Sequence, residues 1–306
     1  MKIFCLFAKE NWFVDRFAEE FYKYSDHEVV SDYNDADLIW IIAPWMWNSI
    51  PMHAINKPII CTIHHEVPEK MTQQRIQEFH FRDQFVTRYH VPCNKTKEII
   101  SKFTNKPIDV IGYWYDQDLW VPYDKTEARK ELGLPENDFM IGSFQRDTEG
   151  SDLISPKLEK GPDLFCDYVE KIAKEKDNVH VILNGWRRQY VINRLQRAGI
   201  KYTYRELPPI SDVRKMYASC DLYVVAARYE GGPQSVLEAP AMNVPIVSTN
   251  VGMASETLGE NCIIDIENEM YYPTPNDIKR NFENVQKFKI QNHVKEYDMF
   301  FESIIN

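Results

Sequence analysis

The chain has 306 residues and a net charge of −10, and it is 44% hydrophobic and 27% charged. This composition is typical of a folded globular protein and argues against a disordered one. The acidic balance argues against a general nucleic-acid binder, which needs a basic surface to displace counterions. At about 150 residues per domain, the length predicts two domains.

Neither a membrane span nor a secretory leader is expected. The longest uncharged run, Leu38–Asn56, contains Pro44 and Pro51, so it predicts a buried strand and a loop rather than a spanning helix. The apolar start of the chain ends at Lys9 and is shorter than a typical signal core. The six cysteines are scattered without a CxxC pair, which predicts buried thiols. We expect a cytoplasmic protein, and peripheral contact with a membrane surface stays open.

Short apolar runs alternate with helix-like segments along the whole chain. Most runs are continuously apolar, which is typical of parallel strands covered on both faces. The predicted strands are Lys2–Phe7, Leu38–Ala43, Pro58–Ile63, Val86–Val91, Ile108–Ile111, Met140–Phe144, Val179–Leu183, Leu222–Ala226, Pro245–Thr249 and Cys262–Ile266. The predicted helices include Trp12–Tyr24, Lys95–Phe103, Pro162–Ala173, Arg188–Ala198 and Val213–Ser219.

A charged segment without a strand, Pro122–Asp138, predicts a linker, and Gly133 within it predicts a helix end. Strands precede and follow it in similar number. We therefore expect an α/β protein with two doubly wound parallel-sheet domains, residues 1–122 and 123–285, and a cleft between them. Residues 286–306 are expected to form a helix that crosses back to the first domain.

The most informative stretch follows the predicted strand Leu222–Ala226. Gly231 and Gly232 allow a ligand to approach the backbone closely. A helix opened by Pro233 would direct free N–H groups at a pyrophosphate. Glu230 precedes this helix. The alternative interpretation of these residues is a surface carboxylate followed by an ordinary helix.

Seven residues separate Glu230 from Glu238. The segment that contains both, Tyr-Glu-Gly-Gly-Pro-Gln-Ser-Val-Leu-Glu-Ala, resembles the corresponding motif of family GT4. This family comprises the group 1 retaining glycosyltransferases, which have the GT-B fold. The resemblance is best over Met140–Ile266. It implies that Glu238 binds the ribose hydroxyls of a sugar nucleotide and that Glu230 lies by the donor sugar. The donor-binding loop that it implies consists of Gly231, Gly232, Pro233 and Gln234.

A second element supports a diphosphate site. Arg146 follows the strand Met140–Phe144, and Lys160 precedes a Gly-Pro helix start. Arginine and lysine are suited to phosphate oxygens. The resemblance implies that Arg146 and Lys160 hold the diphosphate, although the loop Asp147–Glu159 is longer than is usual in the family. The alternative is that both are solvated surface charges.

In the first half, His64 follows the strand Pro58–Ile63 at its carboxyl end, where open sheets bind ligands. The resemblance implies a catalytic position beside the donor sugar and the acceptor, and a purely structural histidine is the alternative. Trp45 and Trp47 offer an aromatic platform for an acceptor or a membrane contact. We favour core packing for this pair.

Two DxD triplets, Asp35–Asp37 and Asp116–Asp118, are interpreted as turn and cap residues, so no metal is expected. The resemblance implies a metal-independent enzyme without a cofactor. It would move a hexose from a UDP- or GDP-linked sugar, with retention, to a hydroxyl of a glycan, glycolipid or small molecule. The alternatives are a sugar-nucleotide epimerase or phosphorylase of the same architecture, or an inactive sugar-nucleotide-binding protein.

Overall fold

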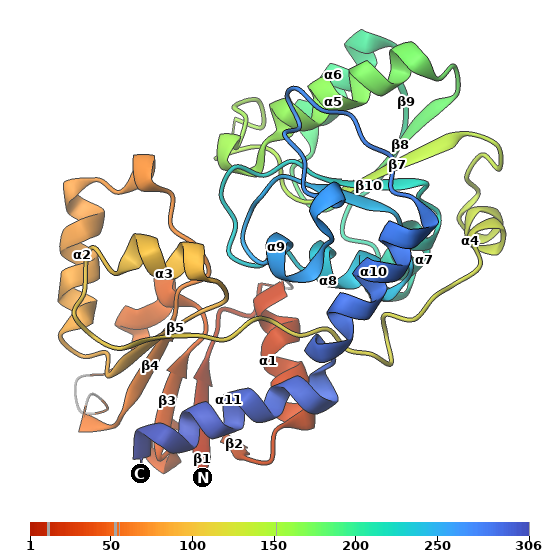
Figure 1. Cartoon of the computed structure of the whole chain (residues 1–306). Coiled ribbons are helices and arrows are strands. Elements are labelled where there is room, and N and C mark those ends of the chain that lie inside the picture. The colour runs from red at the N-terminus through yellow and green to blue at the C-terminus, as the bar shows by residue number, and fades with distance from the viewer. Residues whose placement is uncertain (11–12, 52–53, 55, 151, 306) are drawn as a thin grey trace. The chain divides into compact units, whose positions relative to one another are not determined.

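The computed structural model describes residues 1–10, 13–51, 54, 56–150 and 152–305. Two compact units make up the chain (Figure 1). The first unit comprises Met1–Asp116 and Lys287–Asn306, and the second comprises Gln117–Gln286. Each unit contains one sheet of parallel strands, which confirms the predicted α/β class with two doubly wound sheets.

The sheet of the first unit has the strand order β2-β1-β3-β4-β5-β6. Its strands are β1 (Lys2–Leu6), β2 (Glu28–Val30), β3 (Leu38–Ile41), β4 (Ile59–Thr62), β5 (Arg88–Val91) and β6 (Ile108–Val110). Its helices are α1 (Phe13–Tyr24), α2 (Gln73–Asp83), α3 (Asn94–Ile100) and α11 (Ile290–Ile305). The central strands β3 and β4 are entirely buried, in agreement with their unbroken apolar sequence.

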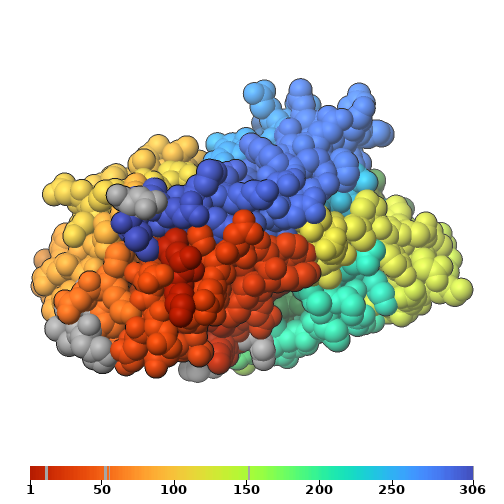
Figure 2. All heavy atoms as spheres, turned by 90° about the horizontal axis from the view of Figure 1, so that it is seen from below, coloured from red at the N-terminus to blue at the C-terminus, as the bar shows by residue number. Residues whose placement is uncertain are grey.

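Strand β3 shows how the two faces of this sheet are covered. Ile39 packs in the cluster that includes Phe79 of α2. Trp40 points to the other face, where its ring lies 5.1 Å from that of Phe21 in α1 and 5.0 Å from that of Phe301 in α11. In Figure 2 the atoms of the last helix, in dark blue, lie against those of the first residues, in red. Segments from both ends of the chain therefore build one core.

The sheet of the second unit has the order β11-β10-β7-β8-β9. Its strands are β7 (Phe139–Phe144), β8 (Val179–Asn184), β9 (Lys201–Arg205), β10 (Leu222–Val225) and β11 (Ile246–Ser248). Its helices are α4 (Lys125–Leu132), α5 (Pro162–Glu175), α6 (Gln189–Ala198), α7 (Ile210–Ala218), α8 (Ser235–Ala241), α9 (Ala254–Thr257) and α10 (Pro275–Val285).

Different helices cover the two faces of this second sheet. The apolar stripe of α5 is buried against one face together with residues of α6. Tyr223 of β10 points to the other face, where its ring lies 5.0 Å from that of Tyr217 in α7. In Figure 1, α5 and α6 accordingly lie on one side of the strands, and α7 and α8 lie on the other. The carboxyl ends of all five strands meet at one edge, because the strands are parallel.

Three local predictions differ from the structure. The edge strands β2 and β9 were not predicted, because they are short or rich in polar residues. The predicted strand Cys262–Ile266 is wrong: a 3-10 helix, Glu260–Cys262, precedes a single bridge from Ile263 to Ser248. The predicted linker contains α4, which packs on α7, and Gly133 ends α4 at a φ of 65° as predicted.

All six cysteines are buried, and none forms a disulfide. Burial raises the pKa of Cys61 to about 11, which keeps its thiol protonated at neutral pH. Among the described residues, no helix combines the length and the apolar character needed to cross a bilayer.

Candidate active site

The second unit has one point where the chain changes its direction across the sheet. From β7 the chain proceeds to β8 and β9 on one side, and it then returns to β10 and β11 on the other. Open parallel sheets bind ligands at such a point, beyond the carboxyl ends of the strands. Arg146 follows β7 and Glu230 follows β10, and these two strands are direct neighbours. The fold therefore brings the two predicted motifs to one place.

Lys160 and Glu230 join these motifs directly, through an ion pair between Nζ and Oε1. Their side chains are only 14% and 13% exposed. A pair that is withdrawn from water to this degree stays stable only with close, well-oriented partners. Two residues that the sequence interpretation assigned to separate roles thus form one electrostatic unit.

The loop after β10 is also tied to the start of α5 by hydrogen bonds. The amides of Arg228 and Tyr229 donate to the Glu159 carbonyl at 2.8 and 3.0 Å. The Arg228 guanidinium donates to both carboxylate oxygens of Asp163, at 2.8 and 2.7 Å. Burial alone raises the pKa of Asp163, yet its bonds to Arg228 lower it overall. Bidentate pairs of this kind fix geometry as well as adding stability.

Two glycines allow the backbone segments at this edge to touch. Gly161 adopts a φ of 62°, and a Cβ built there would lie 1.8 Å from the Ala226 carbonyl oxygen. Gly252 adopts a φ of 52°, and its Cβ would lie 2.2 Å from the Gly231 carbonyl oxygen. Only glycine satisfies both the left-handed conformation and the close approach. The helix start at Pro162, which the sequence predicted, is held against the end of β10 by this contact.

Glu238 lies within α8, is 5% exposed and accepts a hydrogen bond from the Tyr217 hydroxyl at 2.9 Å. Burial, and then the Glu238 charge, raise the pKa of Tyr217, so the phenol stays a donor. Sequence reasoning missed Tyr217, because its contact with Glu238 joins two helices and leaves no local pattern.

The loop before α8 departs from its predicted form. The helix begins at Ser235 with Gln234 as its cap, so Pro233 lies outside it rather than in its first turn. The Pro233 carbonyl accepts from the Val236 amide at 3.0 Å, which makes a preceding turn. Gly231 is buried, and Gly232, Pro233 and Gln234 are partly exposed.

Arg146 is partly buried, and its Nε donates to the Thr148 carbonyl at 2.8 Å. Burial, and then the neighbouring Arg187 charge, lower the pKa of Arg146. A cation held in a cationic surrounding is favourable for binding an anion. This position is compatible with the predicted diphosphate role.

His64 belongs to the first unit, at the carboxyl end of β4 as predicted. Its Nε2 lies 2.8 Å from the Ile42 carbonyl oxygen, and its Nδ1 contacts the Tyr113 hydroxyl. A carbonyl can only accept, so Nε2 carries the proton and Nδ1 accepts from Tyr113. The structure thus gives His64 a fixed tautomer, and its catalytic role stays a prediction.

The tryptophans near His64 occupy different surroundings. Trp45 is 52% exposed, and its ring lies 6.3 Å from that of His64. Trp47 packs against Phe81 at 5.4 Å and lines an apolar pocket. The favoured prediction of core packing therefore suits Trp47 and is wrong for Trp45.

The residues of the DxD triplets support local structure. Asp37 accepts from the Lys2 amide at 2.7 Å, and Asp35 ends a 3-10 helix. Asp116 accepts from the Tyr24 hydroxyl at 3.3 Å. Within the described ranges, no three His, Cys, Asp or Glu side chains are grouped as metal ligands.

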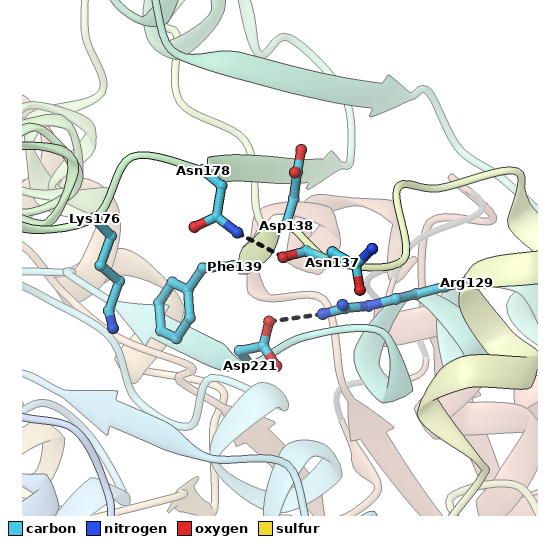
Figure 3. Close-up of a pocket in the computed structure, with 7 residues that line it drawn as sticks. All are labelled: Arg129, Asn137, Asp138, Phe139, Lys176, Asn178 and Asp221. Carbon is cyan, nitrogen blue, oxygen red and sulfur yellow. Dashed lines mark hydrogen bonds and ion pairs between the residues drawn. The ribbon is translucent and has the colours of Figure 1, made fainter.

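A polar recess lies at the opposite edge of the second sheet, beside the amino ends of β7, β8 and β10 (Figure 3). Asp221 binds Arg129 there at 2.6 Å, and Lys125 at 2.7 Å. Asn178 donates to the Asn137 carbonyl at 2.5 Å. These bonds join α4 to the sheet, so we assign the recess a structural role.

Known proteins resemble this chain both in sequence and in fold. Residues 124–270 match the model of the family described as "Glycosyl transferases group 1". The lipopolysaccharide core biosynthesis mannosyltransferase LpsB of Rhizobium meliloti is 30% identical over 142 residues, which are 44% of this chain and 38% of that protein. The D-inositol 3-phosphate glycosyltransferase of Segniliparus rotundus is 26% identical over 47% of this chain and 32% of its own length. The chain thus spans about a third of the curated relatives that it matches.

A likeness in fold extends over both units. The crystal structure of Anabaena HepE in complex with UDP-glucose matches with a TM-score of 0.78 and 15% identity, and it covers 99% of each chain. This likeness confirms the predicted GT-B type of fold. The sequence match to the group 1 glycosyl transferases covers residues 124–270, just under half of the chain.

Proposed function

We propose that this protein is a glycosyltransferase that moves a sugar from a nucleotide-diphosphate sugar to a hydroxyl acceptor with retention. The observation that carries the proposal is the Lys160–Glu230 ion pair, which lies where the chain changes direction across the second sheet. This pair joins the motif expected to bind phosphate to the motif expected to bind the sugar. The family match over residues 124–270 supports the proposal. The fold likeness to a protein solved with UDP-glucose favours a UDP-linked donor over a GDP-linked one.

In this scheme, Arg146, Lys160 and the start of α5 bind the diphosphate. Helix α5 has 14 residues and begins at Pro162, so its first N–H groups add a positive field to that of the two side chains. The carboxylate of Glu238, oriented by Tyr217, accepts hydrogen bonds from the ribose hydroxyls. The loop of Gly231, Gly232, Pro233 and Gln234 holds the donor sugar.

The chemistry needs charge stabilisation more than a nucleophile. As the bond from the sugar to the diphosphate breaks, negative charge grows on the diphosphate, where Arg146 and Lys160 stabilise it. Glu230 stays paired with Lys160 and balances the positive charge that grows on the sugar. We assign Glu230 this electrostatic role. The acceptor hydroxyl attacks the sugar from the front face as the bond to the diphosphate breaks, its proton passes to the leaving diphosphate, and no covalent intermediate forms.

The first unit supplies the acceptor side in this proposal. His64, with its proton on Nε2, and the half-exposed Trp45 provide polar and aromatic contacts for a carbohydrate or a lipid-linked sugar. A peripheral contact with a membrane fits a lipid-linked acceptor. No metal or cofactor takes part, because side-chain cations and the helix field provide the positive potential.

The test is to titrate UDP, GDP and their glucose conjugates into the full chain by calorimetry, and then to follow each bound donor by NMR. Slow release of free sugar without an acceptor supports a transferase. Inversion of a sugar hydroxyl identifies an epimerase, and consumption only with inorganic phosphate identifies a phosphorylase. Tight binding without any turnover identifies an inactive binder and contradicts the proposal.

A further inference from the structure

Between Arg146 and the start of α5, the described residues 147–150 and 152–157 form a short hairpin. Thr148 and Pro156 form an antiparallel bridge, and the Lys157 amide donates to the Asp147 carbonyl at 2.8 Å. The hairpin therefore returns Lys157 to a position beside the residue that follows Arg146.

A buried ion pair anchors the base of this hairpin. Arg188 Nε donates to Asp147 Oδ2 at 2.9 Å, and both side chains are 1% exposed. Arg188 also donates to the carbonyls of Ser143 and Asn184, at the ends of β7 and β8. The Arg187 carbonyl accepts from the Asp147 amide at 3.2 Å. A buried pair with this many additional bonds fixes the hairpin on the rigid sheet.

This arrangement places Lys157 close enough to Lys160 and Arg146 for their charges to interact. Its side chain is 23% exposed, and its Nζ lies 3.6 Å from Glu159 Oε1. Burial lowers the pKa of Lys157, and the charges of Lys160 and Arg146 lower it further. These three cations and Arg187, which neighbours Arg146, face three carboxylates, so the cluster keeps an excess of one positive charge; the carboxylates are Glu149, Glu159 and Glu230. Like charges held together are unfavourable unless an anion joins them.

We propose that Lys157 is a third cationic ligand of the diphosphate, and that the hairpin between Arg146 and α5 carries it to the Arg146–Lys160 site. This inference rests on the proposed function, because the diphosphate is that of its donor. The lysine ammonium offers three donors on a flexible stem, which suits the non-bridging oxygens of a diphosphate. The inserted hairpin then provides a ligand that a shorter loop would lack.

The experiment measures the binding of inorganic pyrophosphate and of UDP to the full chain by calorimetry. Lys157→Met and Lys157→Gln remove the charge with two different side chains, and thermal unfolding checks that each variant is folded. Lys174→Met is the matched control, because Lys174 is an exposed lysine of α5 in the same unit. Lys157→Arg keeps the charge.

We expect both charge-removing variants to weaken pyrophosphate binding roughly tenfold or more, as for the loss of a charged hydrogen bond. The Lys174 variant should change it less than about twofold, and Lys157→Arg should retain most of it. Unchanged affinity in both Lys157 variants, equal losses in the Lys174 control, or no pyrophosphate binding by the wild type overturns the inference.

The two proposals are separable in the same data. If pyrophosphate binding depends on Lys157 but UDP does not bind, the inference stands and the proposed donor is wrong. If UDP binds to the Lys157 variants as tightly as to the wild type, and they turn over UDP-glucose equally well, the proposed function stands and the inference is overturned.

Discussion

At the scale of single residues, Glu238 and His90 show what burial does to a polar side chain. Glu238 is held by Tyr217 on the edge of the proposed donor site. His90 belongs to β5 of the first sheet and is fully buried, far along the chain from that site. Each therefore makes a distinct and measurable prediction, one on ligand binding and one on stability.

Glu238→Ala should weaken UDP binding by about 1.5–3 kcal/mol, because a charged acceptor for ribose hydroxyls is lost. Tyr217→Phe should weaken it less, because it removes only the bond that orients the carboxylate. The control Glu175→Ala removes an exposed carboxylate at the end of α5. Calorimetric titration of all three variants gives the order, and an affinity equal to that of the wild type in Glu238→Ala contradicts the ribose role.

His90 accepts from Thr62 Oγ1 at 3.0 Å through Nδ1 and donates to the Ile111 carbonyl at 2.9 Å through Nε2. Burial lowers its pKa to about 3. In the unfolded chain, His90 binds a proton as the pH falls below about 6.5, whereas in the folded protein it binds this proton only near pH 3. Stability is therefore fully present above about pH 6.5 and falls as the pH decreases, by about 1.4 kcal/mol per unit.

The His90→Asn variant tests this dependence, since it removes the titrating ring. Its free energy of unfolding in urea should fall less steeply between about pH 6.5 and pH 4.5 than that of the wild type. Because both proteins have the same carboxylates, the contribution of these groups to the pH dependence cancels when the two slopes are compared. Parallel slopes would show that another group causes the acid sensitivity.

At the scale of elements, the start of α5 is a fixed point of the second unit. Three features meet there: a left-handed glycine, a proline in the first turn and the contact with the end of β10. The 14-residue helix then buries one apolar stripe on the sheet. The position of its first turn thus depends on Gly161 rather than on a side-chain cap.

Gly161→Ala should destabilise the protein by more than about 2 kcal/mol, because it adds a clash with the Ala226 carbonyl to the cost of positive φ. Gly133→Ala is the matched control. Gly133 has a φ of 65°, but its Cβ would meet nothing within 4 Å, so only the conformational cost of about 1 kcal/mol remains. Thermal unfolding of the two variants separates these effects, and equal shifts in Tm would argue against the close contact.

At the scale of the whole molecule, the last helix completes the core of the first unit. Tyr297 of α11 is fully buried, and its ring lies 4.8 Å from that of Trp114 and 5.8 Å from that of Trp40. Its hydroxyl donates to the Gly112 carbonyl at 3.0 Å. The first unit therefore depends on a helix that lies far along the chain from its strands.

Tyr297→Ala should cost about 3–5 kcal/mol of stability, in the range of large aromatic deletions in a core. Met299 lies on the same helix but is 61% exposed, so Met299→Ala should change stability by less than about 0.5 kcal/mol. Denaturant unfolding, followed by tryptophan fluorescence, reports on the first unit through Trp40 and Trp114. A small effect of both substitutions would contradict the central packing of α11.

The proposed transferase activity should persist in EDTA. Arg146, Lys160 and the start of α5 already provide positive potential at the proposed diphosphate site, so no metal is needed there. Initial rates with UDP-glucose before and after chelation test this expectation. Loss of turnover that Mn²⁺ or Mg²⁺ restores would contradict it.

The sequence by itself determined the α/β class and the order of most core elements, because buried parallel strands read as continuous apolar runs. It also indicated four candidate site residues, since each belongs to a short motif next to a predicted strand or helix: Arg146, Lys160, Glu230 and Glu238. The edge strands β2 and β9 were harder to predict, because solvent on one side permits polar residues.

Only the tertiary structure decided how these motifs meet. Two of these contacts join residues that are distant in sequence: the Lys160–Glu230 pair and the hydrogen bond from Tyr217 to Glu238. The third, the return of Lys157, depends on the path of the hairpin. Local preferences carry no information on such pairings. These pairings form because a parallel sheet places the carboxyl ends of separate strands at one edge. The order of the strands in the sheet then determines which side chains become neighbours.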